Sequence, residues 1–232
     1  MENNKVLILD DEDSIRQFMK INLEYQGYQT VEAATGEEAL RLFEEEDPAV
    51  AILDVMLPGI SGFDVCEAIR EKSPRTGIIM VSAKSQDIDK ILGLERGADD
   101  YIIKPFNPQE LILRVRSLMR RVNLSVDKPE EKNAKTISDG PFTLDLYAKT
   151  FYKNQTEIDV TPTEFAILKN FIQNKGKAMT RDEIMEQTWG ENYSNDTKIV
   201  DVNIRRIRAK IEEDPAKPQF IETVWGTGYR WK

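Results

Sequence analysis

The sequence predicts a doubly wound α/β domain built on a five-stranded parallel sheet, followed by a smaller α+β domain. Between residues 5 and 121, five apolar runs alternate with five helical patterns, which is typical of a parallel sheet with helices on both faces. The second part instead has short strand patterns, three helical patterns and a closing hairpin. A polar stretch without periodicity separates the two parts. The predicted organisation is therefore one domain over 1–121, a flexible linker over 122–138 and a second domain over 139–232.

In the first domain the strand and helix patterns follow one another at the spacing of βα units, so the crossovers are expected to be right-handed. The predicted strands are 5–9, a short one near 30–31, 50–53, 78–81 and 101–103. The predicted helices are 14–25, 35–43, 62–71, a helix near 86–96, and 108–121. Thr35 and Glu38 fit a capping box at the start of the second helix.

In the second domain, strands are predicted over 141–145, 149–152 and 157–160. Thr161 is the expected N-cap of the next helix, because Pro162 suits the first helical position and Glu164 completes a capping box. A shorter helix is predicted over 181–188 and a longer one over 196–213, and residues 220–231 are predicted to form a hairpin.

Composition narrows the class of protein. The chain has 232 residues, of which 40% are hydrophobic and 31% are charged, as in soluble globular proteins. No apolar run approaches the roughly 20 residues of a membrane span, and no signal peptide pattern is present, so we predict a cytoplasmic protein without membrane contact. The single Cys66 excludes an internal disulfide and is expected in the core. The absence of histidine excludes a His-ligated metal and a His general base.

Charge is unevenly distributed along the chain. The formal net charge is −9, and residues 1–138 carry 18 Lys and Arg against 26 Asp and Glu. Residues 139–232 carry 14 against 15, which makes them nearly neutral. This distribution argues against indiscriminate nucleic-acid binding by the first domain and leaves room for a local basic face on the second.

Polar side chains follow four of the predicted strands where each strand ends. Asp54 follows the run 50–53, the pair Asp10 and Asp11 follows 5–9, Ser82 follows 78–81, and Lys104 follows 101–103. A lone Asp in such a place more often starts a turn. Because the carboxyl ends of parallel strands meet at one edge of a sheet, four such strand ends predict a single polar site.

The predicted site suits phosphoryl transfer. Three clustered carboxylates repel one another unless a cation lies between them, and oxygen ligands without His or Cys favour Mg²⁺. Lys104 adds a positive group for a phosphoryl oxygen, so the chemistry supported is phosphoryl transfer onto or off a carboxylate. Ser82 has no adjacent base and is not expected to be the nucleophile.

These motifs resemble the receiver domain of bacterial response regulators, a flavodoxin-like fold, over about residues 4–121. The resemblance rests on Asp10-Asp11, the run from Leu53 to Gly59, Ser82-Ala83, and the run from Lys104 to Phe106. It implies that Asp54 accepts phosphate from a sensor histidine kinase. It also implies that Asp11 and Asp54 bind Mg²⁺ directly, with Asp10 acting through water and the backbone carbonyl of Met56 as a further ligand.

The same resemblance assigns further roles. Lys104 would contact the phosphoryl group and precede a cis bond to Pro105. Ser82 and Tyr101 would form a switch pair, in which the hydroxyl moves toward phosphate and the aromatic ring turns inward. Serine stands where threonine is commoner.

The predicted helix 196–212 carries two distinct faces. Its core stripe consists of Val200, Ile204, Ile207 and Ile211. A second face, about a quarter-turn away, consists of Ile199, Val202, Asn203, Arg206 and Lys210. Arg, Asn and small apolar groups together suit base reading in the DNA major groove, whereas the ordinary alternative is a solvated basic face.

Residues 139–232 resemble the winged helix-turn-helix effector domain of OmpR/PhoB-type regulators. The matching pieces are 160–165, Trp189-Gly190, 200–208 and 223–230. The resemblance implies that 196–212 is the recognition helix and that 226–228 forms the wing tip. Arg205 and Arg208 lie off the groove face, so they are expected to contact phosphates or to pair internally. Trp225 departs from the Arg common at that wing position. The expected DNA-binding residues are Lys198, Ile199, Val202, Asn203, Arg205, Arg206, Arg208, Lys210, Thr227, Tyr229 and Arg230.

The family also implies a symmetric dimer formed on phosphorylation, through the face built by 86–96, 101–103 and 108–121. The expected interface residues are Lys90, Ile91, Leu94, Asp99, Asp100, Glu110, Leu113, Arg114 and Arg116. We expect Lys90 of one chain to meet Glu110 of the other, and Asp100 to meet Arg114. The expected partners are a sensor histidine kinase, double-stranded DNA with direct-repeat sites, and RNA polymerase.

Two other functions share some of these features. A Mg²⁺-dependent aspartyl-phosphate phosphatase would use the same acid and lysine, but such enzymes typically carry an Asp two residues after the nucleophile, where this chain has Met56. An architectural DNA-binding protein with a degenerate receiver would not need the acids, hydroxyl and lysine that are all present. The favoured prediction is a phosphorylation-activated transcription regulator and not an enzyme.

Overall fold

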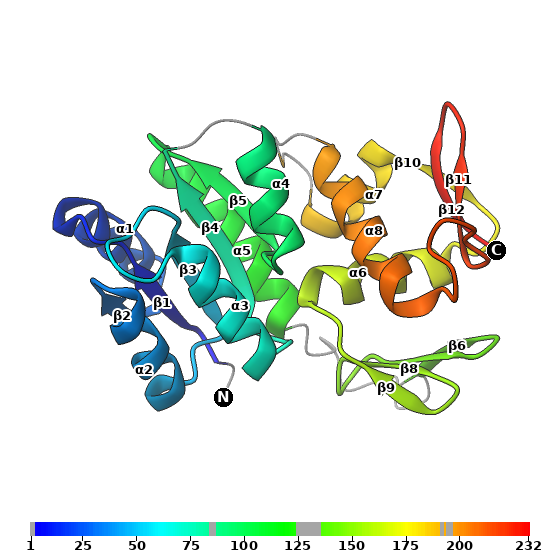
Figure 1. Cartoon of the computed structure of the whole chain (residues 1–232), viewed down its shortest axis with the longest axis horizontal. Helices are drawn as coiled ribbons and strands as arrows, with labels where there is room; N and C mark the ends of the chain where they lie inside the picture. Colours follow the sequence, from blue (N-terminus) through cyan, green and yellow to red (C-terminus); the bar gives the residue numbers. More distant parts are fainter. Residues whose placement is uncertain (1–2, 84–86, 124–135, 191–192, 194–196) are drawn as a thin grey trace. The chain divides into compact units, whose positions relative to one another are not determined.

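The computed structural model describes residues 3–83, 87–123, 136–190, 193 and 197–232. The chain divides into two compact units, residues 1–123 and residues 124–232, and each is described by itself (Figure 1). Among the described residues, no helix combines the length and apolar character needed to cross a bilayer.

The first unit contains a five-stranded parallel sheet in the order β2-β1-β3-β4-β5. Its strands are β1 (Lys5–Leu9), β2 (Gln29–Ala33), β3 (Val50–Asp54), β4 (Gly77–Ser82) and β5 (Asp100–Ile103). Its helices are α1 (Asp13–Tyr25), α2 (Gly36–Glu46), α3 (Gly62–Lys72), α4 (Asp87–Glu95) and α5 (Pro108–Asn123). The predicted doubly wound fold is confirmed. Residue 86, where the fourth helix was predicted to begin, lies outside the described residues.

Alternation along the strands explains why helices cover both faces of this sheet. Val6 and Ile8 of β1, with Val50 and Ile52 of β3, pack in one fully buried cluster with residues of α1 and α5. The intervening side chains point to the opposite face, since successive residues of a strand alternate. There, Met80 of β4 and Phe63 of α3 both lie close to Gly93 of α4, since a Cβ on Gly93 would be 3.4 Å from Met80 Cγ and 3.3 Å from Phe63 Cε1. The strands are thus buried on both faces, as their near-continuous apolar runs predict.

Helix caps agree with the sequence in part. The Thr35 side chain accepts from the Glu38 backbone N–H, as predicted, but the Glu38 carboxylate accepts from Ala34 and not from Thr35. The α2 capping box is therefore only half formed. A complete box that was not predicted starts α3, where Ser61 and Asp64 exchange both bonds.

The second unit is α+β, as predicted. A four-stranded antiparallel sheet is formed by β6 (Thr136–Asp139), β7 (Phe142–Asp145), β8 (Thr150–Lys153) and β9 (Thr156–Ile158). Three helices follow, α6 (Pro162–Gln173), α7 (Arg181–Trp189) and α8 (Lys198–Ile211). A second sheet joins β10 (Ala178–Thr180) to the hairpin of β11 (Ile221–Val224) and β12 (Gly228–Trp231). The predicted capping box of Thr161 and Glu164 on α6 is confirmed.

The boundaries of the predicted linker were too wide. Helix α5 continues to Asn123, and β6 begins at Thr136, where it pairs with Asp145 of β7. Residues 122–123 and 136–138 therefore belong to regular structure. The rest of the predicted linker, 124–135, lies outside the described residues, as does residue 196, where the last helix was predicted to begin.

Candidate functional site

The three predicted acids meet at the carboxyl edge of the parallel sheet. Asp54 is the last residue of β3 and is 4% exposed, Asp10 follows β1 and is fully buried, and Asp11 is exposed. The register of β3 between β1 and β4 brings these strand ends together. One carboxylate oxygen from each acid lies within 4.8 Å of the others, a spacing at which a single metal ion can contact all three.

Lys104 lies between two of these acids. Its Nζ is 2.8 Å from Asp10 Oδ2 and 2.9 Å from Asp54 Oδ2. The Lys104 backbone N–H donates to the Ser82 carbonyl at 2.8 Å, which fixes the end of β5 beside β4. The bond from Lys104 to Pro105 is cis, as the resemblance implied. The structure therefore brings the predicted acids and lysine into one cluster.

Burial and charge set the ionisation of this cluster. Burial raises the pKa of the Asp54 carboxyl, and the neighbouring Asp10 charge acts in the same direction, against the opposing effect of Lys104. Burial also disfavours the Lys104 ammonium, but Asp10 and Asp54 outweigh it and raise the pKa of Lys104. Lys104 is thus held as a cation beside an Asp54 carboxylate that is more basic than an exposed one. Such an oxygen is suited to nucleophilic attack on phosphorus.

Hydrogen bonds hold the acids in place. Asp10 Oδ1 accepts from the backbone N–H of Glu12 at 3.0 Å, and Arg16 donates to the Asp10 carbonyl at 2.8 Å. Asp54 Oδ1 accepts from the backbone N–H of Met56 at 3.4 Å. Asp10 Oδ2 is buried and contacts Lys104 without hydrogen-bond geometry. This oxygen-only donor set fits a hard divalent ion.

The predicted switch residues lie on neighbouring strands. Ser82, at the end of β4, is fully buried, and Tyr101, on β5, is 3% exposed. The Tyr101 ring lies close to Gly93 of α4, since a Cβ added to Gly93 would be 3.4 Å from Tyr101 Cδ2. The strand register pairs Tyr101 with Met80, two residues before Ser82. This placement leaves the assignment of the pair a prediction.

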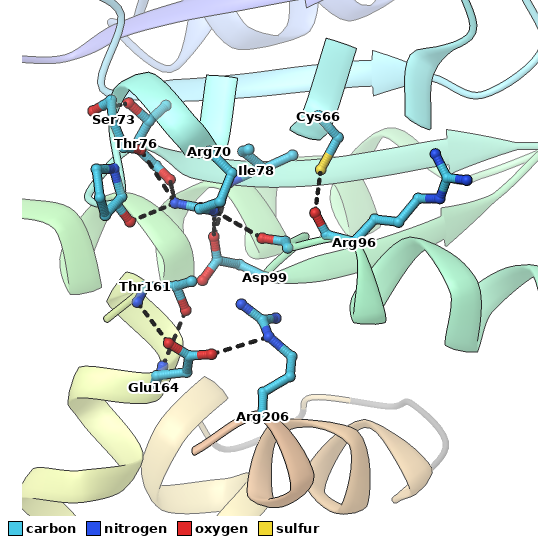
Figure 2. Close-up of polar contacts among 12 residues, drawn as sticks. Cys66, Arg70, Ser73, Thr76, Ile78, Arg96, Asp99, Thr161, Glu164 and Arg206 are labelled. Carbon is cyan, nitrogen blue, oxygen red and sulfur yellow. Dashed lines mark hydrogen bonds and ion pairs between the residues drawn. The ribbon is translucent and has the colours of Figure 1, made fainter. Parts of the chain in front are cut away.

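Part of the predicted dimer surface needs correction. Asp100 and Arg114 were predicted to meet between two chains, but they pair within one chain at 3.0 Å, where Arg114 also binds Glu110 at 2.7 Å. Asp99 is fully buried, and its carboxylate accepts from Arg70 and from the Ile78 backbone N–H, so it cannot contribute to an exposed face (Figure 2). Asp99 directly precedes β5 and Asp100 is its first residue, so both lie in the buried sheet. The sequence pattern did not show that this end of the strand is buried.

Arg116, another residue of the predicted surface, is exposed on α5. Residues two apart on a helix point in nearly opposite directions, so Arg116 points away from the buried Arg114, and its place in the dimer surface stays a prediction. Its positive charge acts on Tyr28, where it opposes the effect of burial, which raises the pKa of that phenol. Leu113 and Leu92 are exposed and remain available for a surface contact.

In the second unit, the predicted base-reading side chains of α8 have internal contacts. Arg206 Nε is 3.0 Å from Glu164 of α6 (Figure 2). Lys210 Nζ is 2.6 Å from the other oxygen of the same carboxylate. The Asn203 amide donates to the Ile199 carbonyl at 2.8 Å. The predicted face is therefore not a free row of donors. Arg206 can read a base only if it leaves Glu164 or contacts Glu164 and the base together.

Other predicted DNA contacts also pair internally. Arg208 donates to the Ile221 carbonyl and to Thr223, which is the internal pairing offered as one alternative for it. Arg230 pairs with Glu222 at 2.8 Å. Tyr229 is 6% exposed, and its hydroxyl donates to Asp201 at 2.8 Å. Four predicted contacts are exposed, namely Lys198, Arg205, Lys210 and Thr227. Three others are buried, which contradicts their assignment to an exposed base-reading face, namely Ile199, Val202 and Asn203.

Two residues that position α8 were not predicted from the sequence. Arg181, the first residue of α7, pairs with Asp201 of α8 at 2.8 Å and lies over the Tyr229 ring. Glu212 accepts from the backbone N–H groups of residues 219, 220 and 221, and so fixes the start of the wing to the end of α8. The available signal for Glu212 in the sequence was an acid directly after a basic helix. No signal in the sequence pointed to Arg181.

Comparison with known proteins identifies both units. The response regulator receiver domain matches residues 6–116, and the C-terminal domain of transcriptional regulatory proteins matches residues 155–231. The alkaline phosphatase synthesis transcriptional regulatory protein PhoP of Bacillus subtilis (strain 168) is 41% identical, over 98% of this chain and 96% of that protein. The probable transcriptional regulator ycf27 of Porphyridium aerugineum is 42% identical, over 99% and 96% of the two chains.

Solved structures agree. The Thermotoga maritima response regulator DrrB, described as an OmpR/PhoB homolog, is 34% identical, with a TM-score of 0.52 over 98% of both chains. A RitR mutant shares the fold with a TM-score of 0.77 over 99% of both chains, at 23% identity. With its receiver unit, its C-terminal regulatory unit and relatives that match along its whole length, the chain belongs to the OmpR/PhoB-type response regulators, and it is a two-component regulator of transcription and not an enzyme.

Proposed function

We propose that this regulator accepts a phosphoryl group on Asp54 from a sensor histidine kinase, and that the modification promotes dimerisation and DNA binding. The observation that carries the proposal is the surroundings of Asp54, whose carboxylate lies 2.9 Å from Lys104 and within metal-sharing distance of Asp10 and Asp11. A buried carboxylate with a raised pKa, flanked by a cation, is suited to attack phosphorus.

Mg²⁺ is the proposed metal ion. Asp11, Asp54 and the Met56 carbonyl would hold it directly, and Asp10 would hold it through water. The ion would neutralise charge on the phosphoryl oxygens. Lys104 then contacts the same phosphoryl group. Its ammonium pairs with a phosphoryl oxygen in place of the Asp54 carboxylate. Ser82 and Tyr101 respond to the phosphoryl group as the switch pair.

The proposed output is transcription control in the cytoplasm. Helix α8 enters the major groove and the β11–β12 wing contacts the flanking backbone, with RNA polymerase as a further partner. Two effector domains bind head to tail on a direct repeat, so half-sites recur about every 10–10.5 base pairs, one helical turn apart.

Footprinting of genomic DNA with and without acetyl phosphate and Mg²⁺ tests this function. Footprints that are unchanged by phosphorylation, or that lack this spacing, contradict it.

The proposed dimer contact between Lys90 and Glu110 predicts a charge-swap result. Glu110→Lys is expected to keep acetyl-phosphate-treated protein monomeric, because like charges then face each other across the twofold axis, where each contact occurs twice. The double variant with Lys90→Glu is expected to recover the dimer. Sedimentation velocity measures both.

A control is needed because Glu110 also binds Arg114 within the chain. Glu110→Gln removes this internal pair without adding a repulsive charge, and Arg114 keeps its buried pair with Asp100. Dimerisation should therefore weaken less than in Glu110→Lys. Normal dimerisation of Glu110→Lys on phosphorylation rules out this interface.

The wing predicts a salt effect. Trp225, 91% exposed, lies in the turn of the β11–β12 hairpin, where relatives of this type commonly carry an Arg. Trp225→Arg is expected to strengthen DNA binding at low salt and to steepen the slope of log affinity against log salt by about one, since one more phosphate is neutralised. Trp225→Ala removes the ring without adding charge and should leave the slope unchanged. Fluorescence anisotropy over a salt series measures both, and an unchanged slope in the Arg variant places the wing tip away from the phosphates.

A further inference from the structure

The first residue of α3 touches the backbone of the proposed phosphoacceptor. A Cβ on Gly62 would lie 1.9 Å from the Asp54 carbonyl oxygen and 2.7 Å from its carbonyl carbon. Real Cβ atoms essentially never come within 3.0 Å of such atoms. Gly62 is not among the residues with positive φ, so its backbone conformation does not demand glycine. Glycine is required for steric reasons, because the start of α3 lies directly against the Asp54 backbone.

The start of α3 is also firmly held. The Ser61 hydroxyl accepts from the Asp64 backbone N–H, and the Asp64 carboxylate accepts from the Ser61 backbone N–H at 3.2 Å. The Gly62 N–H donates to the Val55 carbonyl at 3.3 Å, which closes the loop that follows Asp54. Farther along α3, Val65, Cys66 and Ile69 are fully buried. The helix therefore cannot withdraw from Asp54 without disturbing its own packing.

We propose that Gly62 is a positioning residue for phosphorylation, in which the start of α3 fixes the Asp54 backbone and so aims its carboxylate at the incoming phosphorus. The inference rests on the proposed function of Asp54. A side chain at position 62 has to displace either the Asp54 carbonyl or α3 by roughly 1 Å, the shortfall from 3.0 Å. A misplacement of about 1 Å at a reacting group can slow a reaction by about 10²-fold.

Gly36 offers a matched control. It is the first residue of α2, also lacks a positive φ, and a Cβ there would lie 2.4 Å from Ile60 Cγ1 and 2.9 Å from Val65 Cγ2. This crowding involves side chains and no backbone atom of Asp54. Gly36→Ala therefore adds the same methyl group at the same helical position, but it can reach the acceptor only through the side chains of Ile60 and Val65 and not by contact with the Asp54 backbone.

The test compares phosphorylation rates of the full chain with acetyl phosphate at saturating Mg²⁺, alongside urea unfolding and far-ultraviolet circular dichroism. Gly62→Ala is expected to be phosphorylated at least tenfold more slowly than the natural chain while remaining folded. Gly36→Ala is expected to stay within about threefold of the natural rate, whatever its loss of stability. Equal rates for the two variants, or a Gly62→Ala rate that merely follows unfolding, overturn the proposal.

A second pair of variants decides the matter if Gly62→Ala does not fold. Ser61→Ala removes the cap of α3 and Thr35→Ala removes the cap of α2, and neither adds an atom. Ser61→Ala is expected to slow phosphorylation about two- to fivefold, because a frayed α3 start holds Asp54 less firmly, and Thr35→Ala should leave it unchanged. Equal rates overturn the inference alone. Labelling that persists in Asp54→Asn removes the proposed function itself.

Discussion

A protein carrying Asp54→Asn takes up no phosphoryl group from acetyl phosphate under conditions that label the natural chain. The amide keeps the shape of the carboxylate but has no anionic oxygen to attack phosphorus. It also loses its ion pair with Lys104, which keeps a partner in Asp10. Because burial makes the Asp54 charge costly, its removal should leave the first unit folded and no less stable. Intact-protein mass spectrometry measures the labelling, and urea unfolding measures the stability.

Two comparisons make this result specific. Asp13→Asn alters an exposed acid that belongs to α1 and not to the three-acid cluster, and it should be labelled normally. Chelation of Mg²⁺ should stop labelling of the natural chain, since the clustered carboxylates then repel the incoming phosphate. Labelling of Asp54→Asn at a comparable rate would show that Asp54 is not the acceptor. Labelling that is insensitive to chelation would show that the reaction does not depend on the metal ion.

The acid cluster was predictable because sheet topology alone brings it together. Each of Asp10, Asp54 and Lys104 ends or follows a strand that is recognisable as an apolar run, and parallel neighbours in register deliver such residues to one edge. No side-chain detail was needed. The helices were also predictable, because their caps and periodicity are local properties of the sequence.

The missed features depend on contacts between distant segments. Strands β6 and β10 have four and three residues and lack a long apolar run, so only their pairing with β7 and β12 defines them. The sequence assigned Arg206 to one face of α8 but not to its partner Glu164, which comes from another helix. It also did not show that Val202 and Asn203 of that face are buried. Helical periodicity specifies which way a side chain points and not what it meets. For the same reason, the pair that Asp100 and Arg114 make within one chain was not predicted.

The second large effect is expected at Glu164, the fully buried acid that Arg206 and Lys210 share. Glu164→Gln removes the buried charge that pairs with both cations. Breaking a buried ion pair from one side typically costs about 3–5 kcal/mol, and the lower end is expected because Lys210 can turn to water. Urea unfolding followed by tryptophan fluorescence measures the loss, since Trp189, Trp225 and Trp231 all belong to the second unit. Glu222→Gln, which breaks the more exposed pair with Arg230, is the matched control and should change stability little.

The pH dependence follows from the same contacts. Burial alone raises the pKa of Glu164, but the charges of Arg206 and Lys210 outweigh it and hold the pKa below its usual range. A carboxyl whose folded pKa is lowered stabilises the fold at pH values above its unfolded pKa, about 4.3 for Glu. This contribution is lost as the pH falls through the folded pKa. The stability of the second unit should therefore decline below about pH 4.3, and Glu164→Gln should reduce that decline.

Arg206 connects this ion pair to DNA recognition. If Arg206 reads a base, Arg206→Ala should weaken specific binding by about 1–3 kcal/mol and relax sequence preference at one position. Arg205→Ala, on the exposed neighbour, should weaken binding to all sequences evenly and reduce the salt slope by about one. Because Arg206→Ala also leaves Glu164 with only Lys210, affinities should be compared under conditions where unfolding curves show both variants folded. Selection from a randomised operator pool measures the preference. A preference unchanged by Arg206→Ala would mean that Arg206 serves the fold through Glu164 and that the base-reading face of α8 was assigned wrongly.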